Sequence, residues 1–313
     1  MTNSVSAYAP ATVANVCCAF DVLGFAVDKP GDIVTVSKTD SPKNISIKSI
    51  TGDNGKLPLD PKKNTASVAV QEFLNFLKID TGISITIDKK MPLGSGLGSS
   101  AASSVAALFA INELFNKPLS REELLPFAIK AESIACGAAH ADNVAPALFG
   151  GFILIRNNSP LDITQIPSPE NLYSSIVHPK IEVNTRDARK ILKQEIPLTK
   201  ATKQWANIAG LIAGLYRSDY DLISRSLEDH IFEEHRKILI PGFDKIKKKA
   251  LQSGALGCGI SGSGPSVFAL STSEKEANKI AKNMSLAFTE EGVESNSFVS
   301  KINNTGPKIL KTI

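Results

Sequence analysis

Alternating hydrophobic and polar positions mark the first part of the chain, and helical spacing takes over towards its middle. Alternation with a period of two, together with short apolar runs, predicts strands at residues 5–9, 33–37, 45–50, 83–87 and 152–156. Apolar residues three and four positions apart predict helices at residues 66–77, 99–115 and 120–133. Ser120 and Glu123 have the spacing of a capping box, which places the start of the third helix.

A polar, proline-containing stretch at residues 157–170 divides the chain. Beyond it the pattern predicts a strand, several helices, two strands, a helix and a final strand. The last three strands are expected at residues 255–260, 266–270 and 296–299. Strands and helices mix without regular β-α-β alternation, so we expect an α+β fold in both halves. With ~150 residues as a usual domain size, the 313 residues predict two domains, residues 1–165 and 166–313.

Composition and charge exclude several classes of protein. The chain is 42% hydrophobic and 21% charged, with a net charge of +4, as in ordinary soluble proteins. Its lysine runs at residues 89–90 and 245–249 are short and lack interleaved aromatics, so we expect solvated faces rather than nucleic-acid binding. The longest apolar runs fall short of the ~20 residues of a membrane span, and the N-terminus does not resemble a signal peptide. The four cysteines form no C-x-x-C pair, which favours reduced thiols in a cytoplasmic protein.

A serine- and glycine-rich stretch at residues 91–104 runs directly into the second predicted helix. A glycine turn lets backbone N–H groups approach a phosphate, and a helix N-terminus adds about half a positive charge. Gly94, Gly96 and Gly98 would allow that approach, while Ser99 and Ser100 would offer a cap hydroxyl and a metal or phosphate contact. The alternative is a flexible linker with a small-residue helix packed behind it. The common P-loop is excluded because neither Lys-Ser nor Lys-Thr follows the last glycine.

A second glycine-rich stretch, residues 257–262, matches the weak G-x-G-x-x-G pattern. A dinucleotide fingerprint opens a helix near the start of its domain, whereas this stretch runs into a predicted strand. A nicotinamide oxidoreductase is therefore disfavoured. We expect a loop that approaches a ligand or another backbone closely, or else a plain tight turn.

Three motifs in this order resemble those of the galactokinase, homoserine kinase, mevalonate kinase and phosphomevalonate kinase superfamily. They are residues 9–24, 92–102 and 257–266. Within that superfamily, four stretches are similar to the homoserine kinases in particular: residues 15–21, 140–151, 185–189 and 236–243. The resemblance implies an N-terminal domain like domain 2 of ribosomal protein S5 and a C-terminal ferredoxin-like α/β sandwich. It also implies a homodimer that phosphorylates the side-chain hydroxyl of L-homoserine with Mg·ATP, giving O-phospho-L-homoserine for threonine biosynthesis.

The same resemblance assigns residues to the nucleotide. The phosphate-binding residues are Pro92, Leu93, Gly94, Ser95, Gly96, Leu97, Gly98, Ser99, Ser100, Ala101 and Ala102. Glu132 and the Ser100 hydroxyl would hold Mg²⁺, which prefers hard oxygen ligands. Asn64 would help to bind the nucleoside. From the pattern alone, a solvent-facing position on the helix is the alternative for Glu132.

Homoserine is a zwitterion, so its two charges call for different partners. Guanidinium forks suit its carboxylate, for which Arg189 and Arg236 are the candidates. Acceptors suit its ammonium group, for which the candidates are Asn15, Asp21 and Asp142.

The hydroxyl of the amino acid needs orienting groups of its own. His140 and Asn143 lie beside Asp142 in the sequence and could orient it, and Thr185 could contact the transferred phosphate. A loose phosphoryl-transfer transition state asks little of the nucleophile, so we expect Asp142 to anchor the substrate rather than to act as its base. A mevalonate- or sugar-type kinase and a non-catalytic ligand sensor on the same fold are the remaining alternatives.

The chain departs from the homoserine kinase pattern in three places, one of which is Ala141, where the family tends to have a proline. The first motif usually reads Leu-Gly-Pro-Gly-Phe-Asp, but residues 16–21 read Val-Cys-Cys-Ala-Phe-Asp, which removes two glycines suited to positive φ. Cys17 and Cys18 would then be small packing residues, or else thiols near the substrate. The family also tends to have His-Gln-Pro-Tyr at residues 232–235, ahead of Arg236, where this chain reads Phe-Glu-Glu-His.

Overall fold

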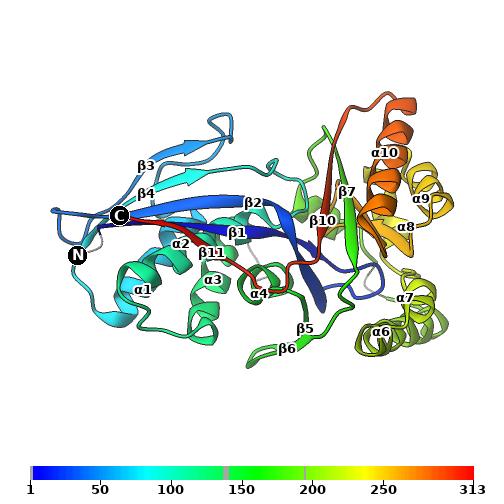
Figure 1. The fold of residues 1–313 in the computed structure, drawn as a ribbon, viewed down its shortest axis with the longest axis horizontal. Helices are drawn as coiled ribbons and strands as arrows, with labels where there is room; N and C mark the ends of the chain where they lie inside the picture. The colour runs from blue at the N-terminus through cyan, green and yellow to red at the C-terminus, as the bar shows by residue number, and fades with distance from the viewer. Residues whose placement is uncertain (1–2, 137–140, 194) are drawn as a thin grey trace.

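The computed structural model describes residues 3–136, 141–193 and 195–313. A seven-stranded sheet dominates the first half of the chain. Both termini lie at the end of this sheet that is remote from the second half (Figure 1). Its strands are β1 Ser4–Ala14, β2 Leu23–Thr39, β3 Ile45–Thr51, β4 Gly82–Asp88, β5 Phe152–Asn158, β6 Leu161–Ile166 and β11 Lys308–Thr312. The order is β11-β1-β2-β4-β3, and β5 pairs with both β2 and β6. All pairs are antiparallel except the parallel pair of β3 and β4.

Four helices pack together against this sheet (Figure 1). They are α1 Thr65–Leu77, α2 Ser99–Leu114, α3 Arg121–Cys136 and α4 Ala141–Phe149. The central helix, α2, is buried almost all round, because its small alanine and serine side chains allow β1, β2 and the other three helices to approach closely. This burial fixes the direction of α2, whose N-terminus points at the site described below.

The second half is built on a four-stranded antiparallel sheet with the order β10-β7-β9-β8. Its strands are β7 Tyr173–Pro179, β8 Gly257–Ile260, β9 Val267–Ser271 and β10 Ser295–Lys301. The helices are α5 Thr185–Lys190, α6 Leu198–Arg217, α7 Tyr220–Ser226, α8 Glu233–Arg236, α9 Phe243–Gln252 and α10 Glu274–Glu290. Helices separate the first strand from the second and the third from the fourth, which is the ferredoxin-like β-α-β-β-α-β arrangement.

A shared core joins the halves. The ring of Phe25 on β2 meets that of Phe268 on β9 with centroids 5.8 Å apart, and buried residues of α6 and α7 belong to the same apolar cluster. A second cluster lies between the small sheet and helices α9 and α10.

The α+β fold is confirmed, and so is the capping box, where the Ser120 backbone N–H donates to Glu123 Oε2 at 2.8 Å. Three features differ from expectation. The polar stretch at residues 157–170 contains β6, because its backbone pairs with that of β5 across a hairpin. Strand β2 starts ten residues earlier than predicted, at Leu23, and α4 was not predicted as a helix.

The domain boundary after residue 165 stays a prediction. Strand β11 lies at the end of the chain and yet pairs with β1 in the large sheet of the first half. Among the described helices, none combines the length and the apolar character required to cross a bilayer.

Candidate active site

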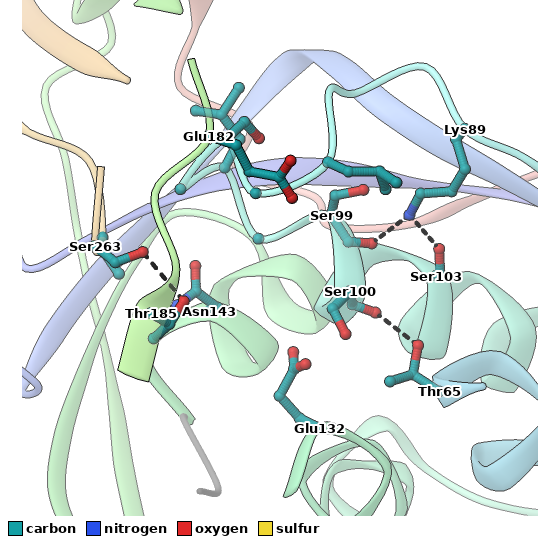
Figure 2. Close-up of a pocket in the computed structure, with 18 of the residues that line it drawn as sticks. Thr65, Lys89, Ser99, Ser100, Ser103, Glu132, Asn143, Glu182, Thr185 and Ser263 are labelled. Carbon is teal, nitrogen blue, oxygen red and sulfur yellow. Dashed lines mark hydrogen bonds between the residues drawn. The ribbon is translucent and has the colours of Figure 1, made fainter. Parts of the chain in front are cut away.

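A cavity of about 430 Å³ lies where the two halves meet. The serine- and glycine-rich loop, the N-terminus of α2, and residues of α3, α4 and α5 line it, together with the turn between β8 and β9 (Figure 2). Its volume is in the range of small-ligand sites. Most of the residues that the resemblance assigns to a nucleotide and to an amino acid therefore share one cavity. Pro92, Ala101 and Ala102 do not line it.

The two glycine-rich turns touch each other. The Ser261 hydroxyl donates to the Gly96 carbonyl at 2.7 Å, and the Ser266 N–H donates to the Ser95 carbonyl at 3.2 Å. Gly96 has a φ of +75°, and a Cβ added there would lie 2.3 Å from the Ser261 carbonyl oxygen. Glycine is needed at this position because two backbones meet there. The loop is thus held by contacts with the second turn, which is not the structure of a flexible linker.

Two buried hydroxyls and a buried carboxylate lie at the phosphate end of the cavity. The side-chain oxygens of Ser95 and Ser100 have no hydrogen-bond partner within the described chain. Glu132 on α3 is only 3% exposed, and its carboxylate points into the cavity towards the first turn of α2 (Figure 2). The solvent-facing alternative for Glu132 is therefore wrong.

Oxygen atoms of this kind suit Mg²⁺, which usually binds proteins through one or two carboxylates and completes its shell with water and phosphate oxygens. Across the described ranges, no cluster of three or more His, Cys, Asp or Glu side chains could hold a metal ion on its own. The donors present thus fit a Mg²⁺ ion that completes its shell with phosphate and water oxygens.

The other end of the cavity carries paired charges. Arg189 Nη2 donates to both carboxylate oxygens of Asp21, at 2.7 and 2.9 Å. Arg236 is buried and donates to the carbonyls of Gly262 at 3.0 Å and Ala188 at 3.3 Å. Both guanidinium groups lie near the Phe20 ring, 5.5 Å away for Arg189 and 4.7 Å for Arg236. The structure brings the two arginines to one place although 46 residues separate them in the sequence.

Burial changes the acid–base behaviour of this end. It raises the pKa of Asp142 to about 7, helped by the nearby Asp21 carboxylate and opposed by Arg189. It also lowers the pKa of Arg236 to about 10, with Arg189 acting in the same direction. Arg236 remains a cation at neutral pH, whereas Asp142 exchanges its proton there.

Polar side chains tie the two ends together. Asn15 Nδ2 donates to the Gly262 carbonyl at 2.8 Å, and its Oδ1 accepts from the Asp21 N–H at 3.0 Å. Asn143 Oδ1 accepts from the Thr12 hydroxyl at 2.8 Å. The hydroxyls of Thr185 and Ser263 are hydrogen-bonded at 3.2 Å (Figure 2). His140 lies outside the described residues.

Comparison with known proteins identifies the family. The models of the GHMP kinase N-terminal domain and C-terminal region match residues 64–151 and 211–290. A homoserine kinase of Chlorobaculum tepidum is 50% identical over 99% of both chains. The chain belongs to the homoserine kinases. The crystal structure of a homoserine kinase from Cytophaga hutchinsonii superposes with a TM-score of 0.97 at 55% identity, covering 99% of this chain and 98% of that one.

The fold extends beyond the homoserine kinases. An L. major mevalonate kinase structure in complex with R-mevalonate superposes with a TM-score of 0.71 at 19% identity, over 94% of this chain and 95% of that one. At that identity the likeness shows the fold alone.

The loop of the first motif, residues 15–21, contains no glycine but has backbone angles that favour glycine. Asn15, Val16, Cys17 and Asp21 all have positive φ, and the value for Val16 is +39°. A β-branched residue rarely adopts this conformation, so the surrounding contacts must hold the loop there. Cys17 and Cys18 are buried, and burial raises the pKa of both thiols, that of Cys18 to about 12. These thiols are packing residues.

Two expectations about the phosphate end are corrected. Ser99 does not cap α2, because its hydroxyl donates to Asp32 Oδ2 at 2.8 Å and the cap residue is Gly98, which has no side chain. Lys89 is buried rather than solvated. Its ammonium group contacts Asp32 and donates to the Ser99 carbonyl at 2.8 Å and the Ser103 hydroxyl at 2.7 Å (Figure 2). A short lysine run gives no signal of such a pair.

Asn64 lines the cavity, but its side chain also caps a helix. Its Oδ1 accepts from the Ala66 N–H at 3.1 Å and so caps α1. Its contact with a nucleoside stays a prediction. Sequence reasoning also missed Glu182 and Lys56, which form an exposed ion pair of 3.1 Å at the mouth of the cavity.

Proposed function

We propose that this protein transfers the γ-phosphoryl group of ATP to the side-chain hydroxyl of L-homoserine, giving O-phospho-L-homoserine and ADP. The observation that carries the proposal is one cavity with a glycine-lined anion site at one end and paired opposite charges at the other. A zwitterionic acceptor and a triphosphate donor fit those two ends. The product is the one used in threonine biosynthesis.

At the phosphate end, the loop from Leu93 to Ser100 would cover the triphosphate with backbone N–H groups at the start of α2. The hydroxyl of Ser95, buried without a partner in the described chain, would donate to a phosphate oxygen. Glu132 and the Ser100 hydroxyl would hold Mg²⁺, which neutralises charge on the phosphates when it is bound. Thr185, linked to Ser263, would contact the transferred group.

At the amino-acid end, Asp21 and Arg189 form an ion pair that a zwitterion would enter. The substrate ammonium would bind Asp21 with the help of Asn15 and Asp142, and the carboxylate would bind Arg189 and Arg236. Because Arg236 is held by two carbonyls, its position is already set before substrate arrives. Such preorganisation brings the acceptor hydroxyl into line with the phosphate.

Asp142 would anchor the ammonium group rather than remove the hydroxyl proton. Its pKa near 7 leaves it partly protonated at neutral pH. A bound ammonium group would favour the ionised form, because an opposite charge lowers the pKa of a carboxyl. Phosphoryl transfer through a loose transition state proceeds with late loss of the hydroxyl proton and does not require a strong base.

We also propose that the enzyme works in the cytoplasm and as a homodimer. Cys17, Cys18 and Cys258 are free and buried, which suits a reducing compartment.

A coupled assay of ADP release tests the proposed reaction. L-homoserine should support turnover, whereas 2-aminobutyrate, which lacks the hydroxyl, mevalonate and galactose should not. Arg189→Lys should raise KM for homoserine by roughly a hundredfold, because lysine cannot form the planar fork that a carboxylate accepts. Turnover with mevalonate, or homoserine binding without any ADP release, would refute the proposal.

A further inference from the structure

Two phenylalanine rings stack beside the amino-acid end of the cavity. Phe20, in the loop of the first motif, and Phe232, directly before α8, have ring centroids 3.9 Å apart and an angle of 20° between their planes. Neither ring lines the cavity, whereas Arg189 and Arg236, which lie next to Phe20, do line it. Any effect of the two rings on a bound molecule is therefore indirect.

The Phe20 ring attracts two cations at once. The guanidinium carbon of Arg236 lies over this ring, 4.7 Å from its centroid, and that of Arg189 lies 5.5 Å from it. Both distances are within the limit of about 6 Å for a cation–π interaction. Because Phe232 is stacked on one face of Phe20, the opposite face is left for the guanidinium groups.

Such an attraction matters here because the two arginines repel each other. Burial lowers the pKa of Arg236 to about 10, and the charge of Arg189 acts in the same direction. The Asp21 carboxylate offsets the repulsion at Arg189. A substrate ammonium group that binds Asp21 weakens this contact before the substrate carboxylate is in place. The face of Phe20 is not a partner of the ammonium group, so it can hold both guanidinium groups throughout.

The stack is packed with little room for water. Phe20, Phe232 and Arg236 line a second cavity of only about 10 Å³, the space of about one water molecule. Arg236 itself is 4% exposed. Removal of water strengthens a cation–π interaction, because the cation has no competing solvent shell.

The backbone before α8 fixes the position of Phe232. Asp229 Oδ1 accepts from the Phe232 N–H at 2.9 Å, and its Oδ2 accepts from the Glu233 N–H at 3.0 Å. One turn later, the Arg236 N–H donates to the Phe232 carbonyl at 3.1 Å. The supporting ring and the buried arginine are thus set by the same short helix.

We propose that Phe20, supported by Phe232, is a positioning residue that holds the guanidinium groups of Arg189 and Arg236 together for the carboxylate of the amino acid. The inference rests on the proposed function, since it requires an acceptor that carries a carboxylate. Position 232 is one at which the chain departs from the family pattern, and it supplies the second ring of the stack.

Fluorinated phenylalanine at position 20 tests the proposal, because fluorine withdraws electrons from the ring face and hardly changes the size of the ring. With one, two and three fluorine atoms, KM for L-homoserine should rise in steps to roughly tenfold, while KM for ATP stays constant. The same replacements at Phe25 are the matched control. Phe25 is fully buried, no cation of the described chain lies over its ring, and both constants should stay unchanged.

Ordinary substitutions test the support from Phe232. Phe20→Leu should raise KM for homoserine by roughly thirtyfold, whereas Phe20→Tyr keeps an electron-rich ring and should stay close to wild type. Phe232→Leu acts by way of Phe20, so it should add little when combined with Phe20→Leu. Circular dichroism verifies that each variant is folded.

The outcomes separate this inference from the proposed reaction. If KM for homoserine did not change with the number of fluorine atoms, Phe20 would only fill space and the inference would be overturned. An equal rise in KM for ATP would overturn it as well, because the effect would not be confined to the amino-acid end. Absence of ADP release from wild type with homoserine would refute the reaction itself. If the leucine variants prove unfolded, the fluorinated series decides.

Discussion

The hydroxyl of Ser261 donates a 2.7 Å hydrogen bond to the carbonyl of Gly96 and so joins two loops that lie 165 residues apart in the sequence. This contact places the glycine turn of the second half on the phosphate loop of the first. The cavity therefore depends on the packing of the two halves, and neither glycine motif forms the site alone.

Gly96→Ala should lower kcat/KM for ATP by roughly a hundredfold. The added Cβ would lie 2.3 Å from the Ser261 carbonyl oxygen, so one of the two loops must move, and misplacement on the order of 1 Å costs about that much in rate. Gly292→Ala is the control, because Gly292 has the same φ of +75° and open space around its Cβ position. Steady-state kinetics with ATP as the varied substrate measure the effect. Equal activity of the two variants would show that the contact does not position the loop.

Lys89→Met should destabilise the protein by about 3–5 kcal/mol, since it leaves the Asp32 carboxylate buried without its cation. Asp32→Asn combined with Lys89→Met should cost less than the sum of the single changes. Lys43→Met breaks an exposed ion pair with Asp80 and should cost less than about 1 kcal/mol. Urea unfolding of the wild type, the three single variants and the double variant measures these differences. If Lys89→Met matched Lys43→Met in stability, the buried pair would not hold the loop in place.

Asp142→Asn should raise KM for homoserine and largely preserve kcat, as expected of an anchor. In the wild type, KM for homoserine should fall as pH rises through about 7, because ionised Asp142 binds the ammonium group. The asparagine variant should lose this pH dependence. The opposite split, with KM retained and kcat lost, would identify Asp142 as the base instead.

The same residue predicts how stability depends on pH. Its native pKa of about 7 lies above the ordinary value of 3.8, so the native state binds the proton more tightly than the unfolded chain does. The stabilising contribution is fully present below about pH 4 and is lost as pH rises through 7. The free energy of unfolding of wild type relative to Asp142→Asn should therefore fall over that range by a few kcal/mol. A difference that stays constant between pH 4 and 8 would contradict the raised pKa.

Glu182→Gln should lower KM for ATP by roughly fivefold at low salt, with a smaller effect at high salt. The side chain of Glu182 packs against Gly94, where a Cβ would lie 2.8 Å from its Cγ, and its carboxylate would repel an approaching triphosphate. Asp187→Asn removes an exposed carboxylate that does not line the cavity and serves as the control. An unchanged KM would mean that Lys56 already neutralises Glu182.

Periodicity predicted the fold class, because hydrophobic spacing is a local pattern. The resemblance to known kinases predicted most of the residues that line the cavity, although Pro92, Ala101 and Ala102 are not among them. The remaining features depend on contacts between segments that lie far apart in the sequence, which local patterns do not predict. Strand β11, from the end of the chain, joins the large sheet by pairing with β1, and no local pattern in the sequence predicts this pairing. The Asp32–Lys89 pair and the ties between Asn15, Asp21 and Gly262 likewise join distant segments. Lys89 in particular sits in a short charged run that, by itself, favours a solvated face.

Homoserine is proposed to receive the phosphoryl group of ATP in this cavity. Incubation with γ-labelled ATP and L-homoserine, followed by mass spectrometry of the amino-acid fraction, measures this transfer. Label should appear in O-phospho-L-homoserine in a one-to-one ratio with ADP, and none should appear after Glu132→Gln. Label that appears only in inorganic phosphate, or in another alcohol offered alongside, would contradict it.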